Sequence, residues 1–116
     1  MKKVVSGIYK ITHKNEMYYL GCSVDIFNRF NQHYKDLLDN CHSSVELQKL
    51  FNESKIEDFS FTIYESKQKE EYKKETGLVG QELDKAFKKY LLKREKEIMN
   101  VHSITFALNK RNKQFA

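Results

Sequence analysis

The chain begins with two short apolar runs of the kind that form β-strands. Residues 4–11 and 17–21 are rich in β-branched and aromatic side chains, and a short polar segment, residues 13–16, separates them. This pattern predicts a β-hairpin. Each run also holds a glycine, Gly7 or Gly21, and glycine inside a strand usually marks a bulge or the close approach of another backbone or a ligand.

A tyrosine lies two residues from each of these glycines. Tyr9 follows Gly7 and Tyr19 precedes Gly21. Two paired strands with this spacing can present both phenol hydroxyls on one surface of the sheet. The alternative is an ordinary hairpin with two half-buried tyrosines, and the two strands by themselves do not decide between these interpretations.

The next segments predict two helices, over residues 24–38 and from residue 44 onward. Ser23 can cap the first helix, and Ser43 can cap the second in a capping-box pattern. At about 100° per residue, Arg29 and His33 fall at the border of the first helix's apolar stripe. A side chain at that border can emerge over the sheet edge while its stem stays packed. The residues of the stripe are Ile26, Phe27, Phe30, Tyr34, Leu37 and Leu38.

The second half of the chain predicts one strand and one long helix. Apolar and polar residues alternate over residues 59–64, which predicts a third strand beside the hairpin. Residues 66–74 are a charge run without helical apolar spacing, and we expect a solvated loop or the frayed start of a helix. A helix is predicted over residues 81–102, since the chain has no proline to interrupt it.

Acidic residues of the long helix are candidates for a metal site. Glu97 and Arg94 are expected to fall within its apolar stripe, where a carboxylate is costly unless it is paired or binds a metal. Glu97 is therefore either one half of an i, i+3 ion pair with Arg94 or a metal ligand. Glu95 is the rival acid, and we expect it to lie outside the stripe. The stripe comprises Leu83, Ala86, Phe87, Tyr90, Leu91, Ile98 and Val101.

Length and composition favour one domain over residues 1–116. Lys and Arg outnumber Asp and Glu by 21 to 16, and this net charge of +5 suits a polyanionic partner without requiring one. No segment approaches the roughly 18 apolar residues of a membrane span, and the start of the chain lacks a signal-peptide core.

Cys22 and Cys41 are too few for a disulfide framework, so we expect reduced thiols and a cytoplasmic location. A zinc site made from these cysteines with His33 and His42 would lack the usual close ligand pairs, and it is disfavoured.

The chemistry-bearing residues together resemble the motif set of the GIY-YIG nuclease family. The stretches 33–37 and 41–48 are similar to the catalytic domain of intron-encoded homing endonucleases and their free-standing phage relatives. The resemblance covers roughly residues 6–109, and it implies an α+β fold with a three-stranded antiparallel sheet flanked by helices. The matching motifs, in chain order, are Gly7-Ile8-Tyr9, Tyr19-Leu20-Gly21, Arg29, His33, Glu97 and Asn109.

The resemblance further implies hydrolysis of DNA phosphodiester bonds with one divalent cation per site, Mg²⁺ or Mn²⁺, and no organic cofactor. Glu97 would be the sole protein ligand of the metal, and Arg29 would stabilise charge on the scissile phosphate. Tyr9 would contact or help to activate the attacking water, with Tyr19 and His33 in support. The general base stays open between Tyr9 and His33.

Other residues would support the site or contact DNA. The resemblance implies supporting roles for Gly7, Gly21, His42 and Asn109. Like Arg29, the basic residues Lys110 and Arg111 are expected to contact DNA.

Two rival functions remain at this point: a non-catalytic nucleic-acid-binding module on the same fold, and a dimeric restriction-type endonuclease. Homing enzymes append a separate DNA-binding region to this domain, so we expect recognition of a long site to need such a region or a protein partner. The chain would then be an excised catalytic domain or a stand-alone nuclease. Either form should bind DNA weakly, through phosphates and with steep salt dependence.

Overall fold

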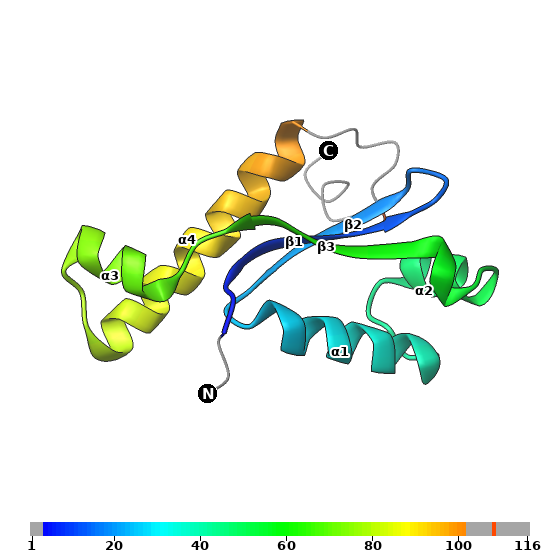
Figure 1. Ribbon diagram of the computed structural model, residues 1–116, viewed down its shortest axis with the longest axis horizontal. Coiled ribbons are helices and arrows are strands. Elements are labelled where there is room, and N and C mark those ends of the chain that lie inside the picture. The colour runs from blue at the N-terminus through cyan, green and yellow to red at the C-terminus, as the bar shows by residue number, and fades with distance from the viewer. Residues whose placement is uncertain (1–3, 102–107, 109–116) are drawn as a thin grey trace.

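The structure is a computed structural model that describes residues 4–101 and Leu108. It is an α+β fold in which a three-stranded antiparallel sheet, in the order β2-β1-β3, has helices on both faces (Figure 1). This confirms the fold class that the sequence predicted. The elements are β1 (Gly7–His13), β2 (Tyr18–Ser23), α1 (Ile26–Leu38), α2 (Val45–Asn52), a 3₁₀ turn (Ile56–Asp58), β3 (Phe59–Ser66), α3 (Lys69–Thr76) and α4 (Gly80–Val101).

Strand β1 lies at the centre of the sheet and begins with an irregularity at Gly7. The register against β3 shifts between Ile8 and Tyr9. Gly7 has a φ of +149°, and a Cβ atom there would lie 2.1 Å from the carbonyl oxygen of Glu65 in β3. Only glycine therefore allows β3 to approach β1 at this point, which confirms the bulge that Gly7 indicated in the sequence.

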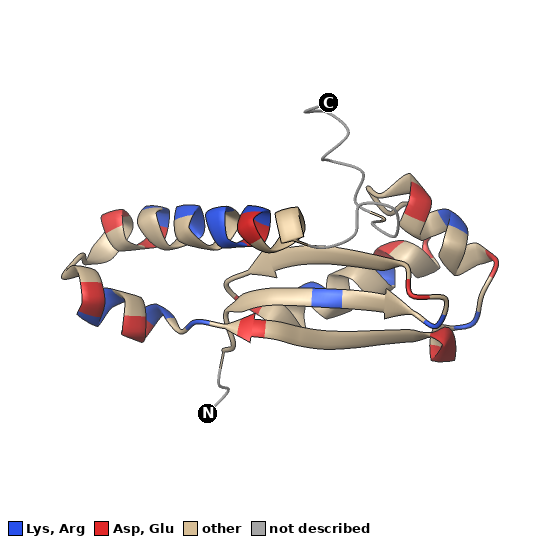
Figure 2. Cartoon of the chain, turned by 90° about the horizontal axis from the view of Figure 1, so that it is seen from above, with Lys and Arg blue, Asp and Glu red and all other residues tan. Residues whose placement is uncertain are grey.

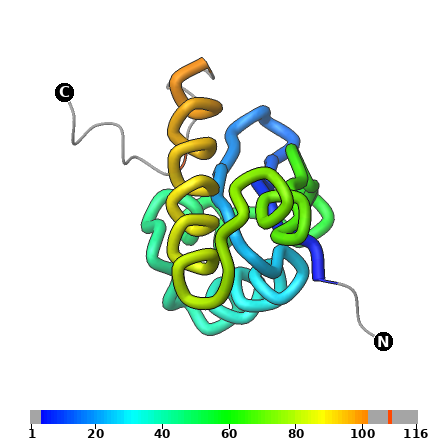
Figure 3. The backbone as a smooth tube through the Cα atoms, turned by 90° about the vertical axis from the view of Figure 1, so that its left-hand side faces the viewer, coloured from blue at the N-terminus to red at the C-terminus, as the bar shows by residue number. Residues whose placement is uncertain are grey.

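The two faces of the sheet bury two separate apolar clusters. Successive side chains of a strand point to opposite faces, so Tyr9 packs towards α1 and α2 whereas Ile8 packs towards α4. The view along the long axis shows α4 running along one side of the strands and α1 lying on another side (Figure 3). The first cluster contains Tyr9, Ile11, Ile26, Leu37, Leu47, Phe59 and Leu108, and the second contains Ile8, Tyr18, Leu20, Ile98 and Met99.

Both predicted helix caps are wrong by one or two residues. The cap of α1 is Asp25, whose side chain accepts a hydrogen bond from the Asn28 amide, because Ser23 still belongs to β2 and pairs with Gly7. The cap of α2 is Ser44, whose hydroxyl oxygen accepts from the amide of Leu47.

The buried face of α1 also differs from the predicted stripe. Ile26, His33 and Leu37 are buried, whereas Phe27 is 49% exposed and Leu38 58% exposed. The orientation of the helix therefore differs from the predicted one, and His33, expected at the border of the stripe, is only 1% exposed. Its neighbour one turn earlier, Arg29, is half-buried at the border, as predicted.

The charge run after β3 is largely helical. Residues Lys69–Thr76 form α3, which ends at Gly77 in the left-handed conformation (φ 76°), so the expectation of a solvated loop is wrong for this part and that of a helix start is met. Most charged residues lie on helices and connecting segments, while the strands carry few (Figure 2). In the part of the chain that the structure describes, no helix is long and apolar enough to cross a membrane.

Candidate active site

Two tyrosines and two histidines converge between the sheet and α1. The hydroxyl oxygen of Tyr9 lies 2.6 Å from Nε2 of His33, and Nδ1 of His33 lies 2.6 Å from Nε2 of His42. The ring of Tyr19 packs edge-on against both imidazoles, with centroid distances of 5.2 and 5.7 Å. We call these four residues the tyrosine–histidine cluster.

The cluster depends on Gly21. Tyr9 in β1 pairs with Gly21 in β2, and a Cβ atom on Gly21 would lie 2.3 Å from the Tyr9 hydroxyl oxygen. The phenol therefore lies directly over the backbone of Gly21, where any other residue would displace it. The glycines flanking the two tyrosines thus have different purposes: Gly7 admits the β3 backbone, and Gly21 admits a side chain.

The loop between α1 and α2 holds His42 at the cluster. The Ser44 amide donates to Nδ1 of His42 at 2.9 Å, and the His42 amide donates to Oε1 of Gln48 at 3.0 Å. Gln48 also donates through Nε2 to the carbonyl oxygen of Leu37, at the end of α1, at 3.0 Å. The imidazole is consequently fixed from both helices. Sequence analysis included Ser44 and Gln48 in a stretch that resembles the homing endonucleases but gave them no role, because only the folded loop brings them to His42.

Burial and the guanidinium of Arg29 set the electrostatics of the cluster. Burial lowers the pKa of His33 to about 3, and the nearby charges of Arg29 and His42 act in the same direction. Burial likewise lowers the pKa of His42. Burial and the neighbouring Tyr19 raise the pKa of Tyr9, while Arg29 beside it opposes the rise. At neutral pH the cluster therefore holds two neutral imidazoles and a neutral phenol next to a permanent positive charge.

The candidate acid of α4 is placed differently from the sequence prediction. Glu95 is 6% exposed and lies on the buried side of the helix, whereas the side chain of Glu97 is 49% exposed. The statement that Glu97 shares the apolar stripe and Glu95 does not is therefore wrong. Five of the six buried residues of α4 follow a four-residue spacing that the sequence already contained, namely Leu83, Phe87, Leu91, Glu95 and Met99, and the sixth is Ile98.

Glu97 instead belongs to a charged group on the outer side of the helix. Its carboxylate accepts from Arg94 at 3.1 Å, the i, i+3 pair that the sequence left open as the alternative to a metal ligand. Arg94 also donates from two nitrogens to both carboxylate oxygens of Glu65, at 2.7 and 2.9 Å. Arg94 thus links α4 to β3, and Glu97 is an exposed partner in that link.

Not every predicted site residue can be placed. Asn109, Lys110 and Arg111 lie outside the described residues. Across residues 4–101 and 108, no three side chains of His, Cys, Asp or Glu gather into a group that could hold a metal ion. Within the described part of the chain, neither Cys22 nor Cys41 forms a disulfide. These residues thus give no support to a closed zinc site, and a cation held there would rely on few protein ligands.

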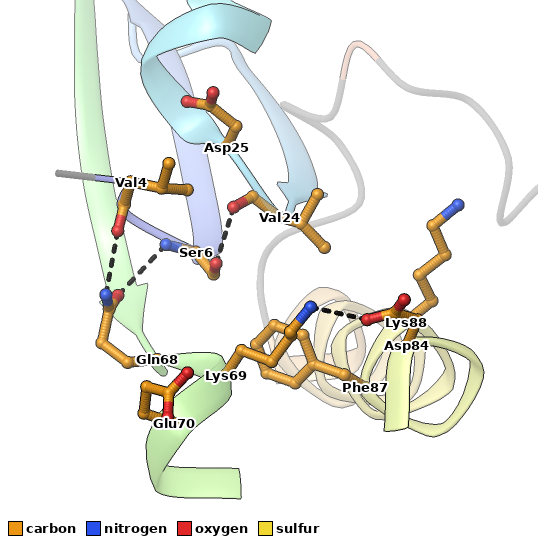
Figure 4. A pocket seen from close by; sticks show the side chains of 10 residues that line it. All are labelled: Val4, Ser6, Val24, Asp25, Gln68, Lys69, Glu70, Asp84, Phe87 and Lys88. Carbon is orange, nitrogen blue, oxygen red and sulfur yellow. Dashed lines mark hydrogen bonds and ion pairs between the residues drawn. The ribbon is translucent and has the colours of Figure 1, made fainter. Parts of the chain in front are cut away.

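A hollow of about 670 Å³ lies away from the cluster, between the start of β1, α3 and α4 (Figure 4). Several of its polar residues bond to one another. Gln68 accepts from the Ser6 amide and donates to the Val4 carbonyl oxygen, and Lys69 pairs with Asp84 at 2.6 Å. None of the residues of the tyrosine–histidine cluster lines this hollow, so it is not part of the candidate site.

Part of the chain is similar in sequence to a phage protein, although no protein-family model matches the chain. Intron-associated endonuclease 1 of Enterobacteria phage T4 is 46% identical over 48 residues, which cover 40% of this chain and 20% of that protein. The chain therefore spans about one fifth of the length of that curated relative.

Two solved structures are similar to the chain. The catalytic domain of homing endonuclease I-TevI is 28% identical, with a TM-score of 0.64 over 90% of this chain and 96% of that one. The catalytic domain of intron endonuclease I-TevI with a glutamate-to-alanine mutation is 38% identical, with a TM-score of 0.52 over 55% of this chain and 66% of that one. Together with the tyrosine–histidine cluster and the glycines that create it, these similarities show that the chain is a GIY-YIG protein of the homing-endonuclease type.

Proposed function

We propose that this protein is a DNA endonuclease that hydrolyses phosphodiester bonds with the help of one divalent cation, Mg²⁺ or Mn²⁺. The observation that carries the proposal is the tyrosine–histidine cluster beside Arg29, in a fold similar to an intron endonuclease catalytic domain. Its groups match what phosphoryl chemistry needs: hydroxyl and imidazole groups held in fixed positions, and a permanent positive charge for the phosphate.

The edge of β2 is where a phosphate could meet groups from both faces of the sheet. Tyr9 belongs to the face that carries α1, and Glu95 belongs to α4, on the opposite face. β2 is an outer strand of the sheet, so no further strand of the described chain lies beyond it. Cys22 packs with the cluster that contains Ile98 and Met99, and it is also near enough to Tyr9 to affect the pKa of the phenol. The two faces therefore approach each other around Gly21 and Cys22.

We propose Glu95, in place of Glu97, as the protein ligand of the cation. Mg²⁺ prefers oxygen ligands and usually keeps several waters, so one carboxylate together with the DNA phosphate is sufficient. Glu95 lies on the buried side of α4, towards the sheet, whereas Glu97 faces solvent, so Glu95 is the better placed of the two acids. The bound cation would supply Lewis-acid charge at the phosphate.

The remaining roles follow from the positions of the chain's own side chains. Arg29 lies beside the Tyr9 hydroxyl, so its guanidinium can pair with a phosphate oxygen placed near that hydroxyl. Tyr9 would orient the attacking water, and Tyr19 keeps the two imidazoles packed. His33 is a poor general base near neutral pH, because both of its nitrogens lie in the hydrogen-bonded chain and its pKa is about 3.

Nicking of supercoiled plasmid DNA tests the proposal, with Mg²⁺, with Mn²⁺ and with a chelator. We expect nicking with either cation and none with the chelator. Glu95→Gln should reduce the rate by about 100-fold or more, since charge stabilisation at a reacting phosphate is typically worth that much. Arg29→Ala should cause a similar loss. Glu97→Gln is the matched control two residues away, and it should keep nearly full activity.

Each contrary result has a definite meaning. Loss of nicking in Glu97→Gln with full activity in Glu95→Gln would overturn the assignment of Glu95. DNA binding without nicking under either cation would favour a non-catalytic binding module. Linear product that appears before nicked circles would favour a dimeric enzyme that cuts both strands in one event.

A further inference from the structure

At its His42 end, the tyrosine–histidine cluster contacts a backbone amide, a group that can donate a hydrogen bond but cannot accept one. Three contacts form a row: the Ser44 amide to Nδ1 of His42 at 2.9 Å, Nε2 of His42 to Nδ1 of His33 at 2.6 Å, and Nε2 of His33 to the Tyr9 hydroxyl oxygen at 2.6 Å. Tyr9, His33 and His42 are 2%, 1% and 8% exposed, so bulk water does not compete for these bonds.

The donor at one end dictates the direction of every bond in the row. A backbone N–H has no lone pair to offer, so Nδ1 of His42 must accept and cannot carry a proton. The single proton of a neutral imidazole then lies on Nε2 of His42, which donates to Nδ1 of His33. By the same reasoning, His33 carries its proton on Nε2 and donates it to the Tyr9 oxygen.

We infer that the Ser44 amide fixes both histidines in the Nε2–H tautomer, so that His33 is a permanent hydrogen-bond donor to Tyr9. His42 is then a positioning residue that acts on Tyr9 through His33. Its imidazole, 8% exposed, relays to His33 the hydrogen-bond direction that the backbone sets. The consequence for catalysis rests on the proposed function, but the tautomers themselves do not.

This polarity decides what Tyr9 can offer to a substrate. Since its oxygen accepts from His33, the phenol proton must point away from the cluster, where it can be donated to a water or a phosphate oxygen. In this arrangement His33 cannot accept the phenol proton, because Nε2 already holds one. The donated hydrogen bond and the adjacent Arg29 would both favour negative charge on the Tyr9 oxygen.

The start of α2 keeps the controlling amide in place. The Ser44 hydroxyl caps α2 by accepting from the Leu47 amide at 3.2 Å, and it donates to the carbonyl oxygen of Leu108 at 2.9 Å. Gln48, one turn into the helix, holds the backbone of His42. The bonds of the Ser44 hydroxyl and of Gln48 hold this part of the backbone in place, so that the Ser44 N–H points towards Nδ1 of His42.

Nitrogen-15 NMR of the histidine rings in the full chain tests the tautomers without DNA, metal or activity. At pH 7.5 we expect His33 and His42 both to show a protonated Nε2 and an unprotonated Nδ1. A protonated Nδ1 on either ring would overturn the inference. Wild-type protein with these tautomers but no nuclease activity would refute the proposed function and leave the inference standing.

Two substitutions of His42 test its positioning role. The side-chain amide of Gln can place an N–H near the position of Nε2, whereas that of Asn is too short to reach His33. We therefore expect His42→Asn to lose the Nε2–H tautomer of His33 and at least about 10-fold in nicking rate, because a wrong tautomer is costly to a catalytic imidazole. His42→Gln should rescue both readouts.

A buried histidine outside the cluster serves as the control. His13 contacts the Ser54 hydroxyl at 3.0 Å and is 6% exposed. His13→Gln should change neither the His33 tautomer nor the nicking rate. If His42→Asn kept the His33 tautomer, or if His42→Gln and His42→Asn behaved alike, the assignment of His42 as a positioning residue would be wrong.

Discussion

The phenol of Tyr9 occupies the space that a side chain at position 21 would fill. The position of the Tyr9 hydroxyl in the cluster therefore depends on Gly21. The phenol oxygen contacts Nε2 of His33 while the ring lies directly over the Gly21 backbone of β2. The sequence allowed Tyr9 and Tyr19 to share a functional surface of the sheet, with an ordinary hairpin as the alternative, and it indicated that a glycine would permit a close approach. It did not predict that His33 would be buried beneath them.

Gly21→Ala should disturb the site and the fold together. The added Cβ would lie 2.3 Å from the Tyr9 hydroxyl oxygen and 2.4 Å from Cζ, both in a ring held by His33 and therefore unable to yield cheaply. We expect a loss of roughly 1–3 kcal/mol in the free energy of unfolding, as for other overpacked cores. Urea denaturation measures this loss.

Cys22→Ala, the next residue of β2 on the opposite face, is the matched control and should have a smaller effect on stability. The nicking rate of Gly21→Ala should fall more than that of Cys22→Ala. Wild-type stability and activity in Gly21→Ala would show that Tyr9 does not depend on this space.

At the scale of the element, α4 packs against two different neighbours. Tyr72 of α3 packs against Phe87 and Tyr90 in the first half of α4, with the rings tilted and centroid distances of 5.5 and 5.3 Å. The second half packs Ile98 and Met99 against the sheet. A single stripe averaged over the whole helix mixes these two contacts, and this explains why the sequence placed Glu97 inside and Glu95 outside.

The bidentate pair between Arg94 and Glu65 should help to hold α4 on β3. Arg94→Met removes both hydrogen bonds, at 2.7 and 2.9 Å, and leaves Glu65 without this partner. We expect a lower Tm and a modest reduction in nicking, because Glu95 is the next residue on the helix. Differential scanning fluorimetry gives the first value and the plasmid assay the second.

Lys69→Met is the control, since the Lys69–Asp84 pair is more exposed and has a single contact. A shift in Tm no larger than that of Lys69→Met would show that the Arg94 pair adds nothing to docking. Arg94→Lys should recover only part of the loss, because an ammonium cannot make the planar two-point contact.

At the scale of the whole molecule, the neutral histidines buried between the sheet and α1 make the free energy of unfolding depend on pH. The groups that face His33 are Tyr9, Tyr19, His42 and Arg29. Asp36, on the same helix as His33, raises the pKa of His33 and so opposes the effect of burial. Below an ordinary histidine pKa of about 6.5, His33 binds a proton in the unfolded chain but not in the folded chain. Stability is therefore complete above that pH and declines as the pH falls from 6.5 towards 3.

Wild-type protein should lose about 1.4 kcal/mol in the free energy of unfolding between pH 7.5 and pH 5.5 through His33, the value for one proton bound only in the unfolded state over one pH unit below 6.5. Urea denaturation at both values measures it. His33→Gln should be less stable at pH 7.5 but should lose less on acidification. An equal loss in wild type and variant would show that His33 is protonated in the fold.

The sequence by itself determined the three strands, the position of the long helix and the motifs that identify a GIY-YIG protein. The strands and the helix depend on local periodicity, which can be read along the chain, and the motifs were recognised by their resemblance to the family. It also left the ion pair of Glu97 with Arg94 open as an alternative, and that pair is present.

Only the tertiary structure decided which acid of α4 is buried, how deeply His33 lies and which backbone group directs the row of hydrogen bonds. Each of these outcomes depends on how a helix is rotated when it packs against distant elements. Such rotation is set by the combined fit of α1, α2, α4 and the two faces of the sheet. A shift of one or two positions leaves the helical pattern almost unchanged, yet it exchanges Glu97 for Glu95 at the buried face.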